Sequence, residues 1–371
     1  PWDPLLTTID RIGVEGLSTS WRRGEEMLRE HGITYNLLSN AGETERRWDL
    51  DPIPLILREN EWEFLSRAVI QRAHLWNRIL HDCYGPQQLL RSGLLPARLL
   101  YSAANFNRSL RYLPAPNKPL LSLYAVDVAR GPNGSWSVVA DRTEAPNGMG
   151  FALENRIVVT SVFPETSRKM HLLRLAPFFQ ALREMLFSHV PNVVDSPRVV
   201  LLSPGPGDQT YFEDAYLSRY LGITLAVGEE LTVRGDRLYL KTVRGLRRVH
   251  VLVRRVPDQA TDPLENPTDS HLGIPGLIQV MRAGAVAVVN PPGTGIAEAP
   301  AFLPVLPSLA RELLGEDLLI PSIDTRWGDP DAAESLDPSG SVIKSALGRN
   351  LFRPYISRKL PEEELAELKQ A

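Results

Sequence analysis

Residues 198–223 read RVVLLSPGPGDQTYFEDAYLSRYLGI, a pattern of strand, turn and helix. A short apolar run is followed by a turn rich in Gly and Pro, and then by helical spacing that ends at Gly222. The alternation continues downstream, with strand patterns at 223–227, 236–242, 249–256 and 285–290 and a helical pattern at 273–284. It predicts an α/β fold with a mostly parallel sheet flanked by helices.

The region before residue 198 is more helical. Apolar residues recur at helical spacing in 20–33, 59–85 and 172–190. Strand patterns at 119–130 and 134–140 are separated by GPNG, which predicts a hairpin. Near the end of the chain we expect a short strand at 341–344 and a charged helix at 361–371. A chain of 371 residues is long enough for two or more domains.

Composition excludes several classes of protein. With 41 basic and 44 acidic residues the net charge is −3, which gives no electrostatic reason to expect nucleic acid, although residues 244–255 form a local basic run. No apolar run approaches the roughly 18 residues of a membrane span. Cys83 is the single cysteine, so an intrachain disulfide is impossible. We expect a cytoplasmic protein without nucleic-acid or membrane partners.

A cluster of ionisable residues lies in VVADRTEAPNGMGFALENR, residues 138–156. Strand alternation lets Asp141 project from a strand end, where enzymes of this fold class often place their chemistry. Gly148 allows a backbone to approach a ligand closely. Glu154 and Arg156 add opposite charges on the next segment. The cluster fits either a ligand-binding loop or a salt-bridged turn that fixes a helix start.

The turn at 203–209 also has two interpretations. It precedes a helix start, where free N–H groups could hold an anion. However, Thr210 and Glu213 have the spacing of a capping box, and spacing alone favours this structural explanation.

Cations close two of the strand patterns. Lys344 could reach a phosphate as a compact point charge, although a lysine at a strand end is more often simply solvated. Arg254 and Arg255 close the strand at 249–253, and alternation sends one side chain to each face.

Five blocks occur in the order found in the circularly permuted type 2 ATP-grasp proteins, and the chain resembles that family. The blocks are ADRTEAPNGMGFALENR, LLSPGPGDQTYFEDAYLSRYLGI, LRRVHVLVRRV with DPLE, HLGIPGLIQVMRAGAVAVVN, and LIPSIDTRWGDP with VIK. The family is related to glutathionylspermidine synthase and, more remotely, to eukaryotic glutathione synthetase. The resemblance covers nearly the whole chain, and is strongest to a branch often joined to a helical alpha-E domain.

The resemblance implies an ATP-grasp architecture of α+β lobes that hold ATP. It implies a mainly helical region at 1–112, a central sheet and cleft region at 113–193, a Rossmann-like domain at 194–320 and the start of the lid at 321–371. The implied activity is that of a carboxylate–amine ligase that uses ATP and Mg²⁺. An acid is activated as an acyl phosphate, and an amine then attacks it to give an amide.

The site residues that the resemblance implies fall into four groups. The catalytic cations are Arg142, Arg255 and Lys344. The nucleotide-binding residues are Asn147, Gly148, Asn155, Arg156 and again Lys344. The residues on the substrate side are Gly205, Thr210, Glu213 and Asp262. The metal candidates are Asp141 and Glu154.

One departure from the family pattern opens an alternative. In glutathionylspermidine synthases the strand before the loop ends in Glu-x-Asn, both implicated as Mg²⁺ ligands, whereas the matching positions here hold Ala140 and Arg142. An alanine cannot bind a metal, and an arginine repels a cation but attracts phosphate. Either Asp141 or Glu154 holds the metal instead, or the site has lost it. The alternative function is a degenerate ATP-grasp module that binds a ligand or assembles with a partner such as an alpha-E domain. A ligase would instead bind small-molecule or peptide carboxylates and amines.

Overall fold

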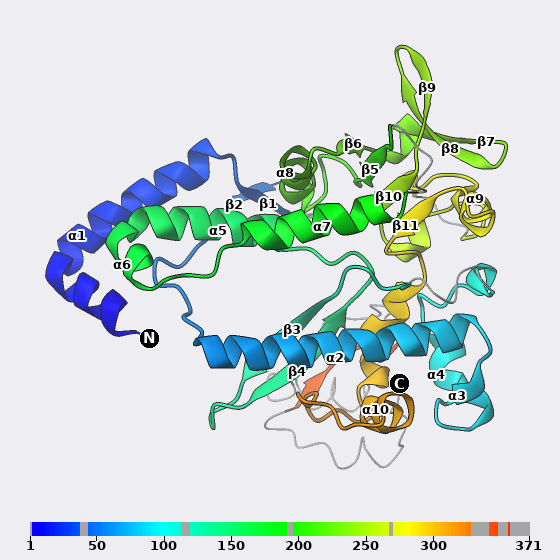
Figure 1. Cartoon of the computed structure of the whole chain (residues 1–371), viewed down its shortest axis with the longest axis horizontal. Helices are drawn as coiled ribbons and strands as arrows, with labels where there is room; N and C mark the ends of the chain where they lie inside the picture. Colours follow the sequence, from blue (N-terminus) through cyan, green and yellow to red (C-terminus); the bar gives the residue numbers. More distant parts are fainter. Residues whose placement is uncertain are drawn as a thin grey trace. The chain divides into compact units, whose positions relative to one another are not determined.

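The computed structural model describes residues 2–37, 44–112, 119–190, 196–266, 270–327, 341–347 and 355–356. Contacts divide the chain into two compact units, shown in Figure 1. The first unit comprises Pro1–Phe64, Pro146–Val256 and Ala260–Val289, and the second comprises Leu65–Ala145, Pro257–Gln259 and Asn290–Ala371. Each unit combines segments that are distant in sequence. The units therefore cut across the four regions expected from the sequence.

The first unit contains the predicted parallel sheet. Its strands lie in the order β11-β10-β5-β6 and all pairs are parallel. The strands are β5 (Val199–Leu202), β6 (Thr224–Ala226), β10 (Val251–Arg254) and β11 (Ala287–Val289). Helix α8 (Tyr211–Leu221) connects β5 to β6, and α9 (Leu277–Arg282) lies between β10 and β11 in sequence. Every residue of β5 and β10 is buried, as expected for strands covered on both faces.

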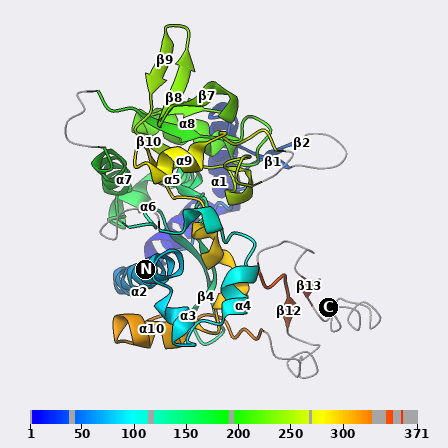
Figure 2. The same ribbon diagram turned by 90° about the vertical axis from the view of Figure 1, so that its right-hand side faces the viewer.

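A second, antiparallel sheet of the first unit projects from the parallel one in Figures 1 and 2. It consists of β7 (Leu231–Arg234), β8 (Arg237–Thr242) and β9 (Gly245–Arg248). The prediction that residues 236–242 belong to the parallel sheet is therefore wrong. Gly235, at φ +56, forms a two-residue turn with Asp236 that reverses the chain, so β8 pairs with β7 instead.

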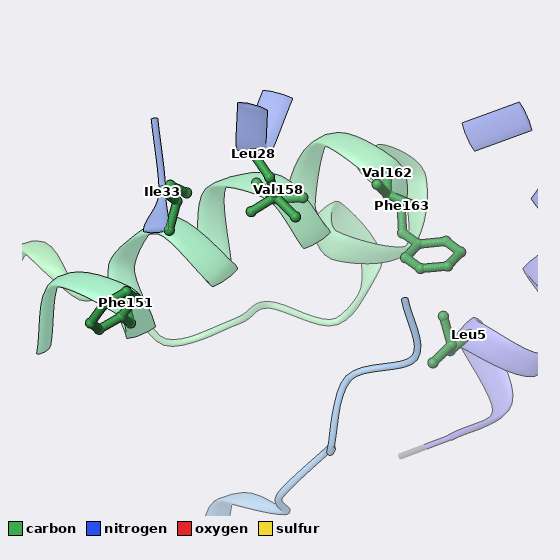
Figure 3. Packing of buried hydrophobic residues seen from close by; sticks show 7 residues of the cluster. All are labelled: Leu5, Leu28, Ile33, Phe151, Val158, Val162 and Phe163. Carbon is green, nitrogen blue, oxygen red and sulfur yellow. The ribbon is translucent and has the colours of Figure 1, made fainter. Parts of the chain in front are cut away.

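Helices cover the rest of the first unit. They are α1 (Asp3–Glu30), α5 (Met149–Val162), α6 (Pro164–Lys169) and α7 (Ala176–Ser188), and a hairpin of β1 (Thr34–Leu37) and β2 (Thr44–Arg47) follows α1. Figure 3 shows Leu5 and Leu28 of α1 in one buried cluster with Phe151, Val158 and Val162 of α5. Helix α1 starts well before the predicted residue 20. The sequence signal is weak there because Gly13, at φ +65, interrupts the helix.

The second unit is built around the predicted hairpin, which is confirmed as β3 (Ala125–Arg130) and β4 (Trp136–Arg142). A distant segment, 321–323, lies along the free side of β4. The Val138 N–H donates to Pro321 O at 2.8 Å, and the Ile323 N–H donates to Val138 O at 2.9 Å. Helix α2 (Glu59–Tyr84), whose larger part belongs to this unit, matches the prediction closely.

The remaining elements are short. The helices are α3 (Gln88–Arg91), α4 (Ala97–Ser102) and α10 (Leu306–Leu314), with 3-10 turns at Arg108–Leu110, Gly228–Glu230, Asp258–Ala260, Thr294–Glu298 and Pro300–Phe302. The predicted strand at 341–344 corresponds to β12 (Val342–Ile343), which pairs with β13 (Tyr355–Ile356). The helix predicted at 361–371 lies outside the described residues.

Among the residues that the structure describes, no helix combines the length and the apolar composition needed to cross a membrane.

Candidate functional site

Two cations, Arg142 and Lys344, come together in the second unit. Arg142 ends β4, and its guanidinium Nη2 lies 2.5 Å from Asp127 Oδ2 while Nη1 lies 3.9 Å from Glu298 Oε2. Burial and the nearby Arg142 both lower the pKa of Lys344, partly offset by the attraction of Asp127. The two strand-end cations therefore share one electrostatic environment, which is what an anion such as a phosphate requires.

The hairpin register explains this grouping. Asp127 lies opposite Ala140 in the pairing of β3 with β4, so its side chain is on the same face as Ala140 and Arg142. The segment after Lys344 is held by two backbone bonds: the Ala301 N–H donates to Ala346 O, and the Ala104 N–H donates to Leu347 O, each at 3.0 Å. Three sequence-distant segments thus contribute to one polar surface.

Glu298 is fixed more firmly than its neighbours. Its Oε1 accepts the backbone N–H groups of Thr143 and Glu144, each at 2.7 Å. Burial raises the pKa of Glu298, and these two donors and Arg142 oppose that shift. Neither Asp127 nor Glu298 was proposed from the sequence. The turn at GPNG alone would not have indicated Asp127, because a bulge between Asp127 and Val128 shifts the pairing by one residue and places Asp127 opposite Ala140.

Asp141 points to the opposite face of β4 from Arg142 and is buried. Its carboxylate receives Arg72 Nε at 2.7 Å and Arg72 Nη2 at 2.8 Å, together with the Trp76 indole N–H at 2.8 Å and the Tyr124 hydroxyl at 2.6 Å. Burial opposes the charge of Arg72, but Asp141 outweighs it and raises the pKa of Arg72. Both oxygens of Asp141 are thus occupied by side chains, and the arrangement is that of a structural ion pair rather than of a metal ligand.

Asp141, a metal candidate from the resemblance, lies on the face of β4 opposite to Arg142, whose charge acts on Lys344. Asp141 and Arg142 are adjacent in β4, so their side chains point to opposite faces of the strand. The inner face takes the carboxylate because α2 supplies Arg72 there, and Arg142 therefore faces the lysine. Arg72 itself was missed, although it stands on the apolar stripe of α2 with Leu65, Ala68, Leu75 and Trp76, where an unpaired arginine would be costly.

A second polar cluster, in the first unit, holds the start of α5. Glu213 of α8 accepts the N–H groups of Gly148 and Gly150 at 3.0 and 2.8 Å, and it also receives Arg255 Nη2 at 2.7 Å. Arg255 Nε donates to Asp214 at 2.8 Å, and the Arg255 guanidinium also donates to Pro146 O. Glu213, Asp214 and Arg255 are all buried. The loop 146–150 is therefore anchored from beneath by α8 and by the end of β10.

This geometry corrects the capping-box prediction. The Thr210 hydroxyl donates to Asp208 at 2.8 Å and makes no cap on its own helix. Glu213 instead caps the start of α5, because α5 and α8 pack together. Gly148 is required at the helix start by its φ of +103, which side chains disfavour.

The other expected site residues between positions 147 and 156 lie at the surface of the first unit or bind other residues of that unit. Glu154 is buried and lies 2.8 Å from His31 Nδ1, and burial together with Glu154 raises the pKa of Tyr216. Asn155 accepts the Trp48 indole N–H at 2.8 Å. Arg156 is half-buried and donates to Leu173 O at 2.7 Å. Asn147 is exposed.

Gly205 and Asp262 have structural partners in the first unit. The Gly205 N–H donates to Ser203 Oγ at 3.1 Å, and Gly205 has a φ of +104. Asp262 is buried and accepts the N–H groups of Leu264, Gly276 and Ile278, so it fixes the turn that leads into α9. Of the expected site residues, Arg142 and Lys344 are brought together in the second unit, and Gly148, Glu213 and Arg255 in the first.

A metal would find few protein ligands in this part of the chain. Within the described ranges no group of three or more His, Cys, Asp or Glu side chains could hold a metal ion. Mg²⁺ that arrives with a nucleotide needs only one or two protein carboxylates, because phosphates and water complete its octahedron. Near Arg142, Glu298 Oε2 is the carboxylate oxygen that remains for such a contact, because the Arg142 guanidinium binds Asp127; Asp141 and Glu154 lie in different units.

The profile of the circularly permuted ATP-grasp type 2 family matches residues 54–371. The chain belongs to this family. Its ATP-grasp membership agrees with the α/β architecture and gives the Arg142–Lys344 surface a biochemical context. The family is one of ligase-type folds, and the expectation drawn from the five sequence blocks is confirmed at this level.

Relatives of this ATP-grasp chain extend the match to its N-terminal part. The uncharacterized protein Rv2567 of Mycobacterium tuberculosis is 34% identical over 368 residues, which are 96% of this chain and 42% of the relative. The uncharacterized protein sll0335 of Synechocystis is 32% identical over 346 residues, which are 92% of this chain and 72% of the relative. The chain spans less than half the length of the first of these relatives.

A solved structure supports the fold. It is that of a glutathione synthetase like-effector from Globodera pallida in its apo form, with a TM-score of 0.55 and 13% sequence identity. The similarity covers 96% of this chain and 78% of the effector. At this level of identity the similarity concerns the fold alone.

Proposed function

We propose that the protein is an ATP-dependent carboxylate–amine ligase. The observation that carries the proposal is the pairing of Arg142 and Lys344 on one surface of an ATP-grasp chain. Two like charges that share an environment repel each other, and a polyphosphate relieves that repulsion. Burial lowers the pKa of Lys344 most, and the nearby charge of Arg142 lowers it further.

The proposed reaction has two steps. An oxygen of the substrate carboxylate attacks the γ-phosphorus of ATP, and the bond to ADP breaks, which leaves an acyl phosphate. The nitrogen of an amine then attacks the acyl carbon, loses a proton to solvent and displaces inorganic phosphate, which leaves an amide. Charge develops on phosphate oxygens in both steps, so fixed cations stabilise them without a nucleophilic side chain.

The chain's own residues have distinct tasks in this proposal. Lys344 and Arg142 bind the transferred phosphate as a point charge and as a planar fork. Asp127 holds the Arg142 guanidinium in place through its contact at 2.5 Å. Glu298, fixed by two backbone donors, limits the movement of Arg142 from the other side. When bound with the nucleotide, Mg²⁺ supplies neutralising charge, and Glu298 Oε2 is the carboxylate oxygen that would contact it.

A second candidate function is favoured by the same arginine. The Arg142 guanidinium lies between the carboxylates of Asp127 and Glu298, a position that a metal ion would occupy in a metal-dependent enzyme. A degenerate ATP-grasp module that binds an anionic ligand or a partner domain, without making an amide, would show this arrangement. The two candidates differ in turnover rather than in binding.

The deciding experiment uses the full-length protein with ATP, Mg²⁺ and pooled carboxylic acids and amines. A ligase releases ADP in proportion to a condensed product that mass spectrometry detects, and Lys344→Ala lowers the rate by about 10²-fold. Lys169→Ala, on the exposed surface of α6, is the matched control and leaves the rate unchanged.

Three outcomes separate the candidates. Product formation that depends on Lys344 supports the ligase. ATP binding by calorimetry that Lys344→Ala abolishes, without product from any pool, supports the ligand-binding module. Absence of both binding and product overturns both candidates.

A further inference from the structure

The antiparallel sheet β7-β8-β9 carries an unusual concentration of positive charge. Residues 231–248 contain one acidic residue, Asp236, and six basic residues, in a chain whose net charge is −3. The basic residues are Arg234, Arg237, Lys241, Arg244, Arg247 and Arg248. The sheet projects from the rest of the first unit in Figures 1 and 2, and the proposed ligase chemistry makes no use of it.

The strand register places four of these cations on one face. Arg234 lies opposite Arg237, and Arg248 lies opposite Tyr239. Since cross-strand partners share a face and alternate residues along a strand do too, Arg234, Arg237, Lys241 and Arg248 point the same way. We call these four residues the basic sheet face. Tyr239 and Leu246 lie among them.

The opposite face fixes the sheet to the first unit. Leu231, Leu238 and Leu240 are buried there. Val233 lies on the same side, next to Gly276 at the start of α9. A Cβ at Gly276 would be in van der Waals contact with the Val233 side chain. The buried face holds the cations of the other face in a fixed register, and three of the four are exposed. A single extended partner could therefore contact the whole basic sheet face.

The arrangement is unfavourable for the isolated sheet. Like charges directly opposite each other on neighbouring strands destabilise a sheet, and Arg234 and Arg237 form such a pair. Lys241 Nζ donates to the backbone oxygen of Glu229 at 2.7 Å, which satisfies a donor without cancelling its charge. Near the base of the sheet, burial and the charges of Arg248 and Arg198 lower the pKa of His250.

We propose that the basic sheet face binds an acidic polypeptide segment in an extended conformation. Guanidinium groups bind carboxylates through two parallel hydrogen bonds, and three of the four cations are arginines. In an extended chain, alternate side chains point the same way at intervals of roughly 6.6 Å. Arg237, Tyr239 and Lys241 follow this repeat along β8, so Arg237 and Lys241 are two repeats apart. The match in repeat favours a peptide with acidic residues at alternate positions.

The peptide would lie across the exposed face, where cations from all three strands select its acidic side chains. Single-stranded nucleic acid is a poorer match because Tyr239 is the single aromatic residue of the face, and bases require stacking platforms.

The test is binding of the full-length protein to a fluorescein-labelled decaglutamate peptide, followed by anisotropy at low and physiological salt. The variant Arg234→Glu/Arg237→Glu/Lys241→Glu reverses three charges of the basic sheet face. The control Arg168→Glu/Lys169→Glu/Arg174→Glu reverses three exposed charges of the same unit at 168–174. Both variants change the net charge equally, and circular dichroism verifies that each is folded.

We expect the parent protein and the control to bind the peptide with similar affinity, and the sheet variant to bind at least tenfold more weakly. A labelled decaglutamine peptide should not bind. Equal loss of affinity in both variants would show only a response to net charge and would overturn the proposal. Tighter binding of a ten-nucleotide single-stranded DNA, lost in the sheet variant, would assign the surface to nucleic acid instead. Neither outcome depends on ligase activity.

Discussion

Arg72 and Asp141 form a fully buried ion pair in the second unit, and its removal has a predictable consequence. Arg72→Met keeps most of the side-chain volume but leaves Asp141 charged and buried with only the donors of Trp76 and Tyr124. Breaking a buried pair by removing one partner typically costs about 3–5 kcal/mol, and we expect a loss of that size in the free energy of unfolding. Urea denaturation followed by tryptophan fluorescence measures it.

The control is the exposed pair of Arg11 and Glu165, whose atoms are 2.7 Å apart. Arg11→Met should leave the free energy of unfolding almost unchanged, because solvent screens exposed ion pairs. A small effect of Arg72→Met, comparable to that of the control, would show that Asp141 is not held by the arginine and would reopen its role as a ligand.

The two neighbours Asp141 and Arg142 show how far single residues could be predicted. The sequence identifies the strand end and its charge, because β4 is short, apolar and followed by a polar loop. It cannot tell which neighbour faces inward, since that depends on Arg72, which is 69 positions away in the chain. Lys344 was identified from its place at a strand end, and the resemblance implied its role; its proximity to Arg142 required the three-dimensional arrangement.

At the level of elements, Glu213 links α8 to the start of α5. Glu213→Gln keeps the shape of the side chain but removes the charge that two backbone N–H groups and Arg255 share. Hydrogen bonds to charged groups contribute about 1.5–3 kcal/mol, so we expect a loss of that order in the free energy of unfolding. Hydrogen exchange, measured by mass spectrometry, should accelerate in peptides that cover 146–152.

Glu184→Gln on the exposed surface of α7 is the comparison for this variant. Its carboxylate accepts a hydrogen bond from Gln180 at 2.9 Å, and an exposed substitution of this kind changes stability by about 0.5 kcal/mol or less. If exchange in 146–152 stays slow in Glu213→Gln, the anchoring of α5 by α8 is not what stabilises the loop.

Elements with a strong, uninterrupted pattern were predicted well, and α2, the β3–β4 hairpin and the parallel strands are examples. Those that depend on partners elsewhere were not. The predicted capping box does not form because Glu213 accepts backbone N–H groups at the start of α5 instead. Residues 236–242 are not part of the parallel sheet because the two-residue turn at Gly235 pairs β8 with β7. Local spacing cannot weigh such competition between neighbouring elements.

At the level of the whole molecule, family and fold class followed from the order of the five sequence blocks, and the family profile confirms them. The two units, each made of several separate segments, differ from the four consecutive regions that the resemblance implied. The chain passes between the units after Phe64, Ala145, Val256, Gln259 and Val289. A linear reading assigns neighbouring residues to one domain, whereas contacts here join segments more than a hundred residues apart.

The pH dependence of stability offers a final prediction. His250 Nδ1 accepts the backbone N–H of Arg198 at 3.1 Å, and burial, Arg248 and Arg198 lower the pKa of His250. As the pH falls below about 6.5, the ordinary value for histidine, the unfolded chain gains a proton at this position that the folded chain resists. The free energy of unfolding therefore decreases as the pH falls through this range.

His250→Gln removes this titration while keeping an acceptor near the Arg198 N–H. We expect the variant to lose less stability than the parent between pH 7.5 and pH 5.5, measured by urea denaturation at both values. The difference at pH 7.5 records any change in packing, because histidine is neutral there in both states. His74→Gln, on the exposed face of α2, should keep the profile of the parent. Identical slopes for the parent and His250→Gln would mean that burial and the charges of Arg248 and Arg198 do not lower the pKa of His250 in the folded chain.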